Sequence, residues 1–136
     1  HVRYLLNAKS QGSILVVGVD SDRAIKLYKG SLRPVVPQNE RAEMLCYQSC
    51  VDFVTLVDDV DEKGAWQYGL LKDLKPDVYV AVEGSYPEKQ LKAIRKLCNE
   101  LVILPRQAEN TSTSKMIQKT LKGHLLKIAH EIAGDV

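Results

Sequence analysis

Basic side chains follow the first strongly apolar segment of the sequence. Residues 14–19 form a continuous apolar run rich in β-branched residues, which is typical of a strand buried on both faces of a sheet. The segment after it carries four cations, Lys26, Lys29, Arg33 and Arg41. Open α/β sheets bind their ligands just beyond the carboxyl ends of parallel strands. The positive charge at this place predicts an anionic ligand, and a phosphate before any other.

Hydroxyl groups gather ahead of the last predicted helix. Residues 110–114 read Asn-Thr-Ser-Thr-Ser, and the free backbone N–H groups and dipole of a following helix favour an anion. Thr113 taken alone would more simply cap that helix, which is a common role of threonine. The presence of Arg106 in the same loop, and of lysines at the same edge of the predicted sheet, favours a polyphosphate. The residues that we expect to hold it are Arg106, Thr111, Ser112 and Thr113.

The elements that position these residues alternate between helix and strand. Helices are expected over 1–11, 23–27, 40–49, 63–73, 87–98 and 113–132, with Thr113 or Ser114 as the last cap and Gly123 as a break. Strands are expected over 14–19, 51–57, 78–82 and 101–104. This order predicts an α/β fold, a single Rossmann-like domain over residues 1–136 whose parallel sheet has helices on both faces. The loops after the strands then meet at one edge, with Lys29, Gly84 and Arg106 among them.

Composition excludes several classes of protein. The 136 residues carry 19 basic and 17 acidic side chains, and a net charge of +2 is too small to predict nucleic-acid or membrane binding. No apolar run reaches transmembrane length, and no signal peptide is recognisable. The three cysteines lack the paired spacing of a metal site and are expected as free thiols of a reducing compartment. A cytoplasmic location is the simplest expectation.

Nearly the whole sequence resembles the cytidylyltransferase-like nucleotidyltransferases. The segment His1-Val2-Arg3 looks like the end of their HxGH motif, and Ser21-Asp22 like the close of their second strand. The sugar-phosphate members of the family carry KG, RPV and ER motifs, which resemble Lys29-Gly30, Arg33-Pro34-Val35 and Glu40-Arg41. A KPD motif of the family resembles Lys75-Pro76-Asp77, and an S-T-T motif resembles Ser112-Thr113-Ser114. The sequence looks most like the adenylyltransferases of heptose 1-phosphate. It is less similar to glycerol-3-phosphate cytidylyltransferases.

The resemblance implies an enzyme that transfers a nucleoside monophosphate from ATP or CTP to a phosphorylated sugar or polyol and releases pyrophosphate. It implies that His1 and Lys29 are catalytic and that Mg²⁺ accompanies the triphosphate, without a metal site of the protein's own. Arg33, Arg41 and Asp52 are expected either to bind the acceptor or to be structural, and the structural alternative pairs Arg41 with Asp52. The implied nucleotide ligands are Gly84, Arg106, Thr111, Ser112 and Thr113.

Two departures from the family pattern leave an alternative open. The family's first strand, its glycine-rich turn and the first HxGH histidine are absent from the sequence, and residues 83–86 read EGSY where members commonly read KGGDY or MGDD. These departures favour a nucleotide-binding regulatory module without turnover as the second hypothesis. A flavodoxin-like or receiver domain would need an acidic pocket or a flavin loop, whereas the predicted sheet edge carries basic residues.

Apolar residues at helical spacing in the last helix predict either a homodimer or packing on the protein's own sheet: Leu121, Leu125, Ile128 and Ile132.

Overall fold

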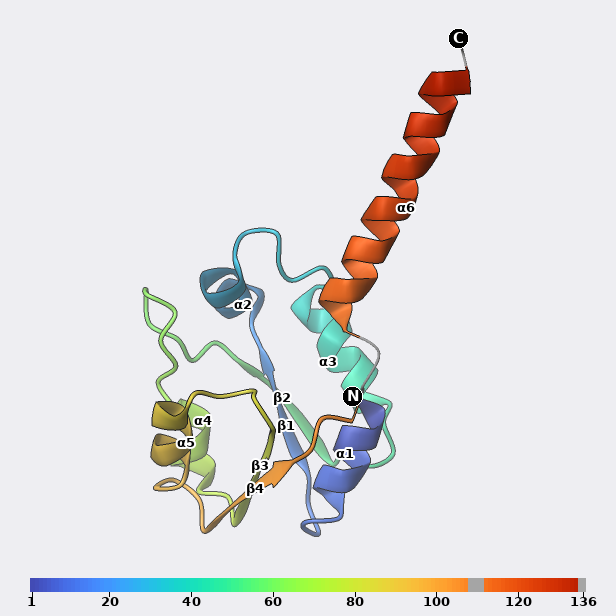
Figure 1. The fold of residues 1–136 in the computed structure, drawn as a ribbon. Helices are drawn as coiled ribbons and strands as arrows, with labels where there is room; N and C mark the ends of the chain where they lie inside the picture. Colours follow the sequence, from blue (N-terminus) through green and yellow to red (C-terminus); the bar gives the residue numbers. More distant parts are fainter. Residues whose placement is uncertain (108–111, 135–136) are drawn as a thin grey trace. The chain divides into compact units, whose positions relative to one another are not determined.

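Helices and parallel strands alternate along the first part of the chain. The computed structural model describes residues 1–107 and 112–134, and the chain divides into two compact units, His1–Pro105 and Arg106–Val136. The second unit contains α6 (Thr113–Gly134). The first unit contains, in order, α1 (Val2–Lys9), β1 (Val16–Asp20), α2 (Asp22–Lys29), α3 (Gln38–Cys46), β2 (Phe53–Val57), α4 (Gly69–Leu74), β3 (Val78–Val82), α5 (Glu88–Ile94) and β4 (Glu100–Leu104) (Figure 1).

The strands of the first unit form two separate parallel pairs. β1 pairs with β2, with Val16 opposite Phe53, and β3 pairs with β4, with Val78 opposite Glu100. Helices α1 and α3 lie on one side of the strands, and α4 and α5 lie on the other (Figure 1). The predicted α/β class, with parallel strands flanked by helices, is confirmed. Within the described residues, however, the strands make two two-stranded sheets rather than the continuous sheet that the sequence predicted.

Burial of β1 is lower than its apolar sequence predicts. Val19 is the one buried residue of this strand, and Ile14, just ahead of it, is 64% exposed. The strand borders a cavity of about 1000 Å³, and within the described residues it pairs with β2 alone. The prediction of burial on both faces is therefore wrong for this strand. The core of the unit consists mainly of small and medium side chains: Leu5, Ala8, Val19, Ala24, Ile25, Cys50, Leu71, Ala81 and Ile94.

Helix α4 begins later than the predicted helix over 63–73. The Asp59 carboxylate accepts hydrogen bonds from the backbone N–H of Gly69 and from Nε1 of Trp66, the latter at 3.1 Å. Gly64 and Tyr68 have positive φ angles of 78° and 59°, a conformation that does not continue a right-handed helix. The carboxylate and these two backbone positions together fix residues 60–68 as a turn. Trp66 is therefore a loop residue that lines the cavity rather than a helical one.

Two serine caps define the starts of α2 and α6. Ser21 Oγ accepts a hydrogen bond from the Ala24 N–H at 3.0 Å and so caps α2. Ser112 Oγ accepts one from the Lys115 N–H at 3.1 Å, so the cap of α6 is Ser112, and the prediction of Thr113 or Ser114 is wrong.

Helix α6 is continuous from Thr113 to Gly134, and Gly123 does not divide it as the sequence predicted. One glycine costs a helix only about 1 kcal/mol relative to alanine, which a helix of this length tolerates. Neither this helix nor any other in the described part of the chain has both the length and the hydropathy needed to cross a bilayer.

Candidate functional site

The cavity of the first unit follows β1 and β3 along their length and reaches the carboxyl end of β1 and the loop after β3. Its wall includes Asp20, the last residue of β1, and Tyr28 and Lys29, the last residues of α2. Ser85 and Tyr86, from the loop after β3, lie on the same wall. Two different strand ends therefore contribute polar side chains to one hollow. Because ligands of open α/β folds bind beyond the carboxyl ends of their strands, we take this part of the cavity as the candidate active site.

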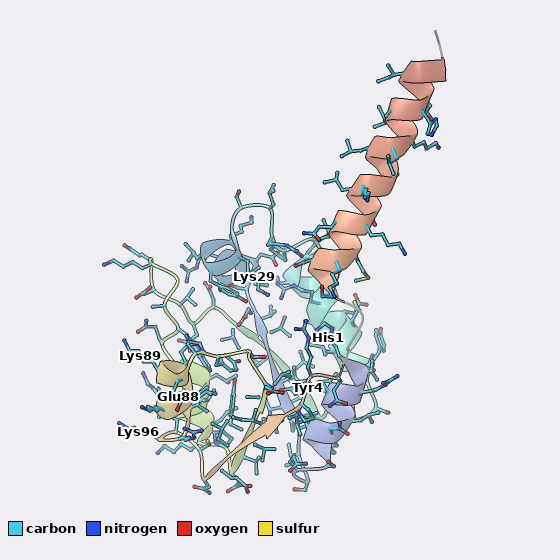
Figure 2. The ribbon with its side chains drawn as sticks, in the orientation of Figure 1. His1, Tyr4, Lys29, Glu88, Lys89 and Lys96 are labelled. Carbon is cyan, nitrogen blue, oxygen red and sulfur yellow. The ribbon has the colours of Figure 1, made fainter. Side chains whose placement is uncertain are left out.

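Lys29 lies on the cavity wall at the end of α2 (Figure 2). Its Nζ is 5.4 Å from the centre of the Tyr28 ring, within the range of a cation–π contact. Tyr28 Oη in turn donates a hydrogen bond of 2.6 Å to Asp20 Oδ2. Gly30, with a φ of 92°, ends the helix directly after the lysine. The sequence analysis placed Lys29 in a loop after a helix over 23–27, whereas it is the last residue of α2. Its catalytic role stays a prediction.

The Tyr28–Asp20 contact joins the last turn of α2 to the end of β1. Burial of the ring, followed by the hydrogen bond to the Asp20 carboxylate, raises the pKa of Tyr28 far above its usual value. The tyrosine therefore stays neutral and keeps its proton for this bond over the physiological range. Asp20 and Tyr28 were not among the residues singled out from the sequence. Their spacing, at a strand end and two turns into the next helix, is the signal that could have identified them.

His1 stands at the start of α1, where it is the N-cap residue (Figure 2). The Leu5 N–H donates a hydrogen bond of 3.0 Å to the carbonyl oxygen of His1, so the helix begins here as predicted. The imidazole makes no capping hydrogen bond and is exposed. The cavity wall does not include His1. The exposed side chain of His1 is thus free to turn toward a ligand, and the catalytic role of His1 stays a prediction.

Gly84 shapes the loop after β3. Its φ of 73° lies in the left-handed region, which favours glycine, whereas a Cβ at this position would meet no atom within 4 Å. The Ser85 N–H donates a hydrogen bond of 3.0 Å to the Val82 carbonyl, closing a tight turn. This turn places Ser85 and Tyr86, rather than Gly84 itself, on the cavity wall.

Aromatic rings cover part of the same wall. The Trp66 ring stacks on Tyr86 with 5.8 Å between centroids and an angle of 22°, and its centroid lies 4.3 Å from that of Tyr68. The hydroxyl groups of Tyr79 and Tyr86 are 2.9 Å apart and share a hydrogen bond. Trp66 and Tyr68 therefore pack against each other. Trp66, Tyr79 and Tyr86 also line the cavity, which the sequence analysis did not predict.

Arg41 and Asp52 are engaged in separate structural contacts. Arg41 Nη2 donates a hydrogen bond of 2.6 Å to Asp22 Oδ1, and its Nε donates to the Val36 carbonyl at 3.0 Å. Asp52 Oδ2 accepts from Lys9 Nζ at 2.5 Å and from the Leu15 N–H at 2.6 Å. The predicted pairing of Arg41 with Asp52 is therefore wrong, because each has a different partner.

Both aspartates of these contacts have a pKa below the usual value. Partial burial alone would raise the pKa of Asp22. The hydrogen bond from Arg41, together with a hydrogen bond from the backbone of Gln38, lowers that pKa instead. The Lys9 hydrogen bond lowers the pKa of Asp52.

Arg33 is the last residue of a turn, which its N–H closes by donating a hydrogen bond of 3.1 Å to the Gly30 carbonyl, and the Arg33–Pro34 peptide bond is cis. A role of Arg33 in binding the acceptor stays a prediction.

The predicted phosphate-binding loop falls in the second unit. Arg106 is exposed. Ser112 uses its hydroxyl oxygen to cap α6, and its carbonyl accepts a hydrogen bond of 2.9 Å from the Met116 N–H. Thr113 is the first residue of α6, and Thr111 lies outside the described residues. A capping serine at a helix start is compatible with a bound anion, because the neighbouring N–H groups remain available.

No group of three or more histidine, cysteine, aspartate or glutamate side chains is arranged to hold a metal ion within residues 1–107 and 112–134. Free thiols are present at Cys46, Cys50 and Cys98, which are exposed, buried and half-buried, respectively.

A model of the cytidylyltransferase-like family matches residues 1–120 of this chain. The bifunctional protein HldE of Helicobacter pylori (strain J99) is 38% identical over 125 residues, which are 91% of this chain and 25% of that protein. The bifunctional protein HldE of Campylobacter fetus subsp. fetus (strain 82-40) is 45% identical over 80 residues, 59% of this chain and 16% of that protein. The chain therefore spans only a quarter or less of the length of these two relatives.

A solved structure has a similar fold. The lipopolysaccharide core biosynthesis protein from Thermoplasma volcanium GSS1 superposes with a TM-score of 0.61 and 25% sequence identity. The similar region covers 81% of this chain and 86% of that one. The likeness therefore extends over most of both proteins.

Proposed function

The chain belongs to the cytidylyltransferase-like family of nucleotidyltransferases, and we propose that it transfers a nucleoside monophosphate from ATP or CTP to a phosphorylated sugar or polyol. Pyrophosphate is the leaving group. A phosphate oxygen of the acceptor attacks the α-phosphorus of the triphosphate, and the bond from that phosphorus to the bridging oxygen of pyrophosphate breaks. The similarity to HldE proteins and to a lipopolysaccharide core biosynthesis protein supports a sugar phosphate as the acceptor.

The position of Lys29 carries this proposal. Lys29 lines the part of the cavity that reaches the carboxyl end of β1 and the loop after β3, where a phosphorylated ligand of this fold would bind. Phosphoryl transfer needs little covalent chemistry from the protein, since positioning and stabilisation of charge supply most of the rate. In the proposal, Lys29 stabilises the charge that develops on the oxygens of the transferring phosphoryl group. The Tyr28 ring, whose centre is 5.4 Å from Lys29 Nζ, lines the same cavity.

The remaining residues have the following proposed roles. His1, at the start of α1, donates a hydrogen bond to the α-phosphate. Arg106 and the α6 start at Ser112 and Thr113 hold the β- and γ-phosphates, and Gly84 lets the loop after β3 approach the nucleotide. Mg²⁺ neutralises phosphate charge when bound, and most of its ligands would be phosphate oxygens and water rather than a protein cage. Asp20, Asp59 and Asp77 line the cavity. Asp59 already accepts hydrogen bonds from Trp66 and Gly69, so Asp20, at the same strand end as Lys29, is the carboxylate that would assist in holding the ion.

A pyrophosphate-release assay tests the proposal. The assay contains Mg²⁺, either ATP or CTP, and a panel of acceptors that includes sugar 1-phosphates and glycerol 3-phosphate. We expect release with one nucleotide and a sugar phosphate. Nucleotide binding by calorimetry without release would instead indicate the regulatory module. Absence of both binding and release with either nucleotide would contradict the proposed function.

A further inference from the structure

Large apolar side chains form a stripe along α6. The helix is continuous over its 22 residues (Figure 1). At 3.6 residues per turn, five of its large apolar residues lie within an arc of about 80° around the axis, and each of them is at least 40% exposed. Apolar surface of this extent usually marks a docking site. The five residues, called the apolar stripe below, are Ile117, Leu121, Leu125, Ile128 and Ile132.

The same helix carries the excess positive charge of the chain. Residues 1–112 contain 15 basic and 15 acidic side chains, so their charges balance. Between Thr113 and Gly134 there are four lysines and one glutamate, which give α6 a formal charge of +3 with its two histidines neutral. The small net charge of the whole chain therefore does not describe this helix. A basic amphipathic helix indicates an anionic partner.

The lysines flank the apolar stripe and do not interrupt it. Around the helix axis, Lys115 and Lys122 lie about 100–120° from the centre of the stripe on one side, and Lys127 lies about 120° from it on the other. Lys119 lies almost opposite the stripe. A lysine stem runs along apolar surface while its ammonium group stays in a polar layer. Flanking lysines beside an apolar stripe are typical of helices that lie in the plane of a membrane surface.

None of the helices in the described part of the chain is apolar and long enough to cross a bilayer. A helix with a stripe and charged flanks instead lies along the surface, with the stripe at the boundary of the acyl chains and the lysines among the headgroups. A second copy of α6 would cover the stripe, but it would bring eight lysines together with two glutamates. Paired helices use opposite charges beside their seam. Anionic lipid satisfies both the stripe and the lysines.

We propose that α6 docks on the surface of a membrane that contains anionic lipids. The apolar stripe enters the headgroup boundary, and Lys115, Lys122 and Lys127 lie beside the lipid phosphates. Without a membrane the stripe is free to pair with a second copy of the chain, and anionic vesicles compete with that pairing. This inference concerns α6 alone and does not depend on the reaction proposed above.

Co-sedimentation of the 136-residue protein with lipid vesicles tests the proposal. One set of vesicles contains equal parts of phosphatidylglycerol and phosphatidylcholine, and the other contains phosphatidylcholine only. We expect binding to the anionic vesicles to exceed binding to the neutral ones by at least about tenfold, because each lysine near an anionic surface contributes about a factor of five. The difference should shrink as salt is added, since salt screens the attraction.

A pair of double variants tests the lysines. Lys115→Gln with Lys122→Gln should weaken binding to the anionic vesicles by at least about tenfold. The control is Lys89→Gln with Lys96→Gln, which removes the same charge from two exposed lysines of the first unit (Figure 2). Because these lysines are not part of α6, the control should bind within about twofold of the parent.

A second pair of variants tests the apolar stripe. Leu125→Gln should weaken binding to the anionic vesicles by about tenfold, because it removes a large aliphatic side chain from the buried face. Leu126→Gln is its control, since Leu126 is 56% exposed against 57% for Leu125 but lies outside the stripe, about 100° further around the helix. This control should bind within about threefold of the parent.

Three outcomes would overturn the proposal. The first is failure of the parent to sediment with anionic vesicles at low salt. Light scattering would then show whether a second copy covers the stripe, and a lowered melting temperature of Leu125→Gln would assign the stripe to the protein's own first unit. The second is equal binding to neutral and anionic vesicles. The third is equal binding by the two lysine double variants, which would show that the lysines of α6 have no part in docking.

Discussion

Tyr4 and Val80, 76 positions apart in the sequence, are joined by a hydrogen bond of 2.7 Å from the tyrosine hydroxyl to the valine carbonyl. The bond fastens α1 to β3. Burial of the hydroxyl, with a smaller contribution from nearby Tyr86, raises the pKa of Tyr4 to about 12. The first helix and the third strand are thus coupled by a donor that must stay protonated.

Replacing Tyr4 by phenylalanine should change the alkaline stability of the protein. Because the folded pKa of Tyr4 is raised, its contribution is fully present below about pH 10 and is lost as the pH rises from about 10 to about 12. Over that window one such proton changes the unfolding free energy by at most about 1.4 kcal/mol per pH unit. Urea unfolding between about pH 9 and pH 12 should show a shallower fall for Tyr4→Phe than for the parent. Parallel curves for the two proteins would contradict the assigned burial.

Lys29→Ala should lower kcat far more than it raises the nucleotide KM. Loss of a single donor that stabilises transition-state charge typically costs about 10²–10³ in turnover. Ser112→Ala should chiefly raise the nucleotide KM, because its proposed contact with the leaving pyrophosphate portion is present in ground and transition states alike. Steady-state kinetics of pyrophosphate release separate the two effects.

Lys26→Ala is the matched control for Lys29→Ala. Lys26 is an exposed lysine of the same last turn of α2 but does not line the cavity. Its replacement should leave kcat within about twofold of the parent, since isolated exposed charges contribute little. Equal losses in Lys26→Ala and Lys29→Ala would mean that net charge matters rather than the position of Lys29. A folded Lys29→Ala protein with full kcat would remove this residue from the catalytic assignment.

Leu125→Glu should dissociate a dimer formed through α6. Ile117, Leu121, Leu125, Ile128 and Ile132 recur every three or four residues and form a narrow apolar stripe, and all are at least 40% exposed. Leu126→Glu is the control, because Leu126 is 56% exposed against 57% for Leu125 but points about 100° away around the helix. Light scattering should report a mass near 15.2 kDa for Leu125→Glu and twice that value for the parent and the control. A monomeric parent would contradict self-association through this helix.

Arg41→Ala should destabilise the protein near neutral pH and less so in acid. Arg41 lowers the pKa of Asp22, so the stabilisation is present above the ordinary aspartate pKa of 3.8 and is lost as the pH falls through the lowered value. The melting temperature of Arg41→Ala should therefore lie below that of the parent at about pH 7 and approach it near about pH 3. Unchanged melting together with a raised acceptor KM would instead assign Arg41 to substrate binding.

The sequence by itself determined the order of elements and much of the local chemistry. β3 lies at the predicted residues, Val78–Val82, because a β-branched run between Pro76 and Gly84 leaves little alternative. Ser21 caps α2 because a side-chain oxygen next to a helix start satisfies a free N–H whatever the surroundings. The motifs around Lys29 predicted the family that the comparison over residues 1–120 confirmed. Such features depend on neighbours within a few positions, so a linear pattern suffices to predict them.

Only the tertiary structure decided which distant groups meet. The sequence suggested Asp52 as the partner of Arg41. In the structure Arg41 pairs with Asp22, because α3 follows α2 closely, and Lys9 of α1 pairs with Asp52. Helix α4 is short because Asp59, a residue of the preceding loop, binds the Gly69 N–H. An apolar run predicts a strand but not its neighbours, so the pairing of β1 with β2 and of β3 with β4 became visible only in the structure. Hydrogen-bonding direction depends on register between strands, and register depends on the packing of the whole unit.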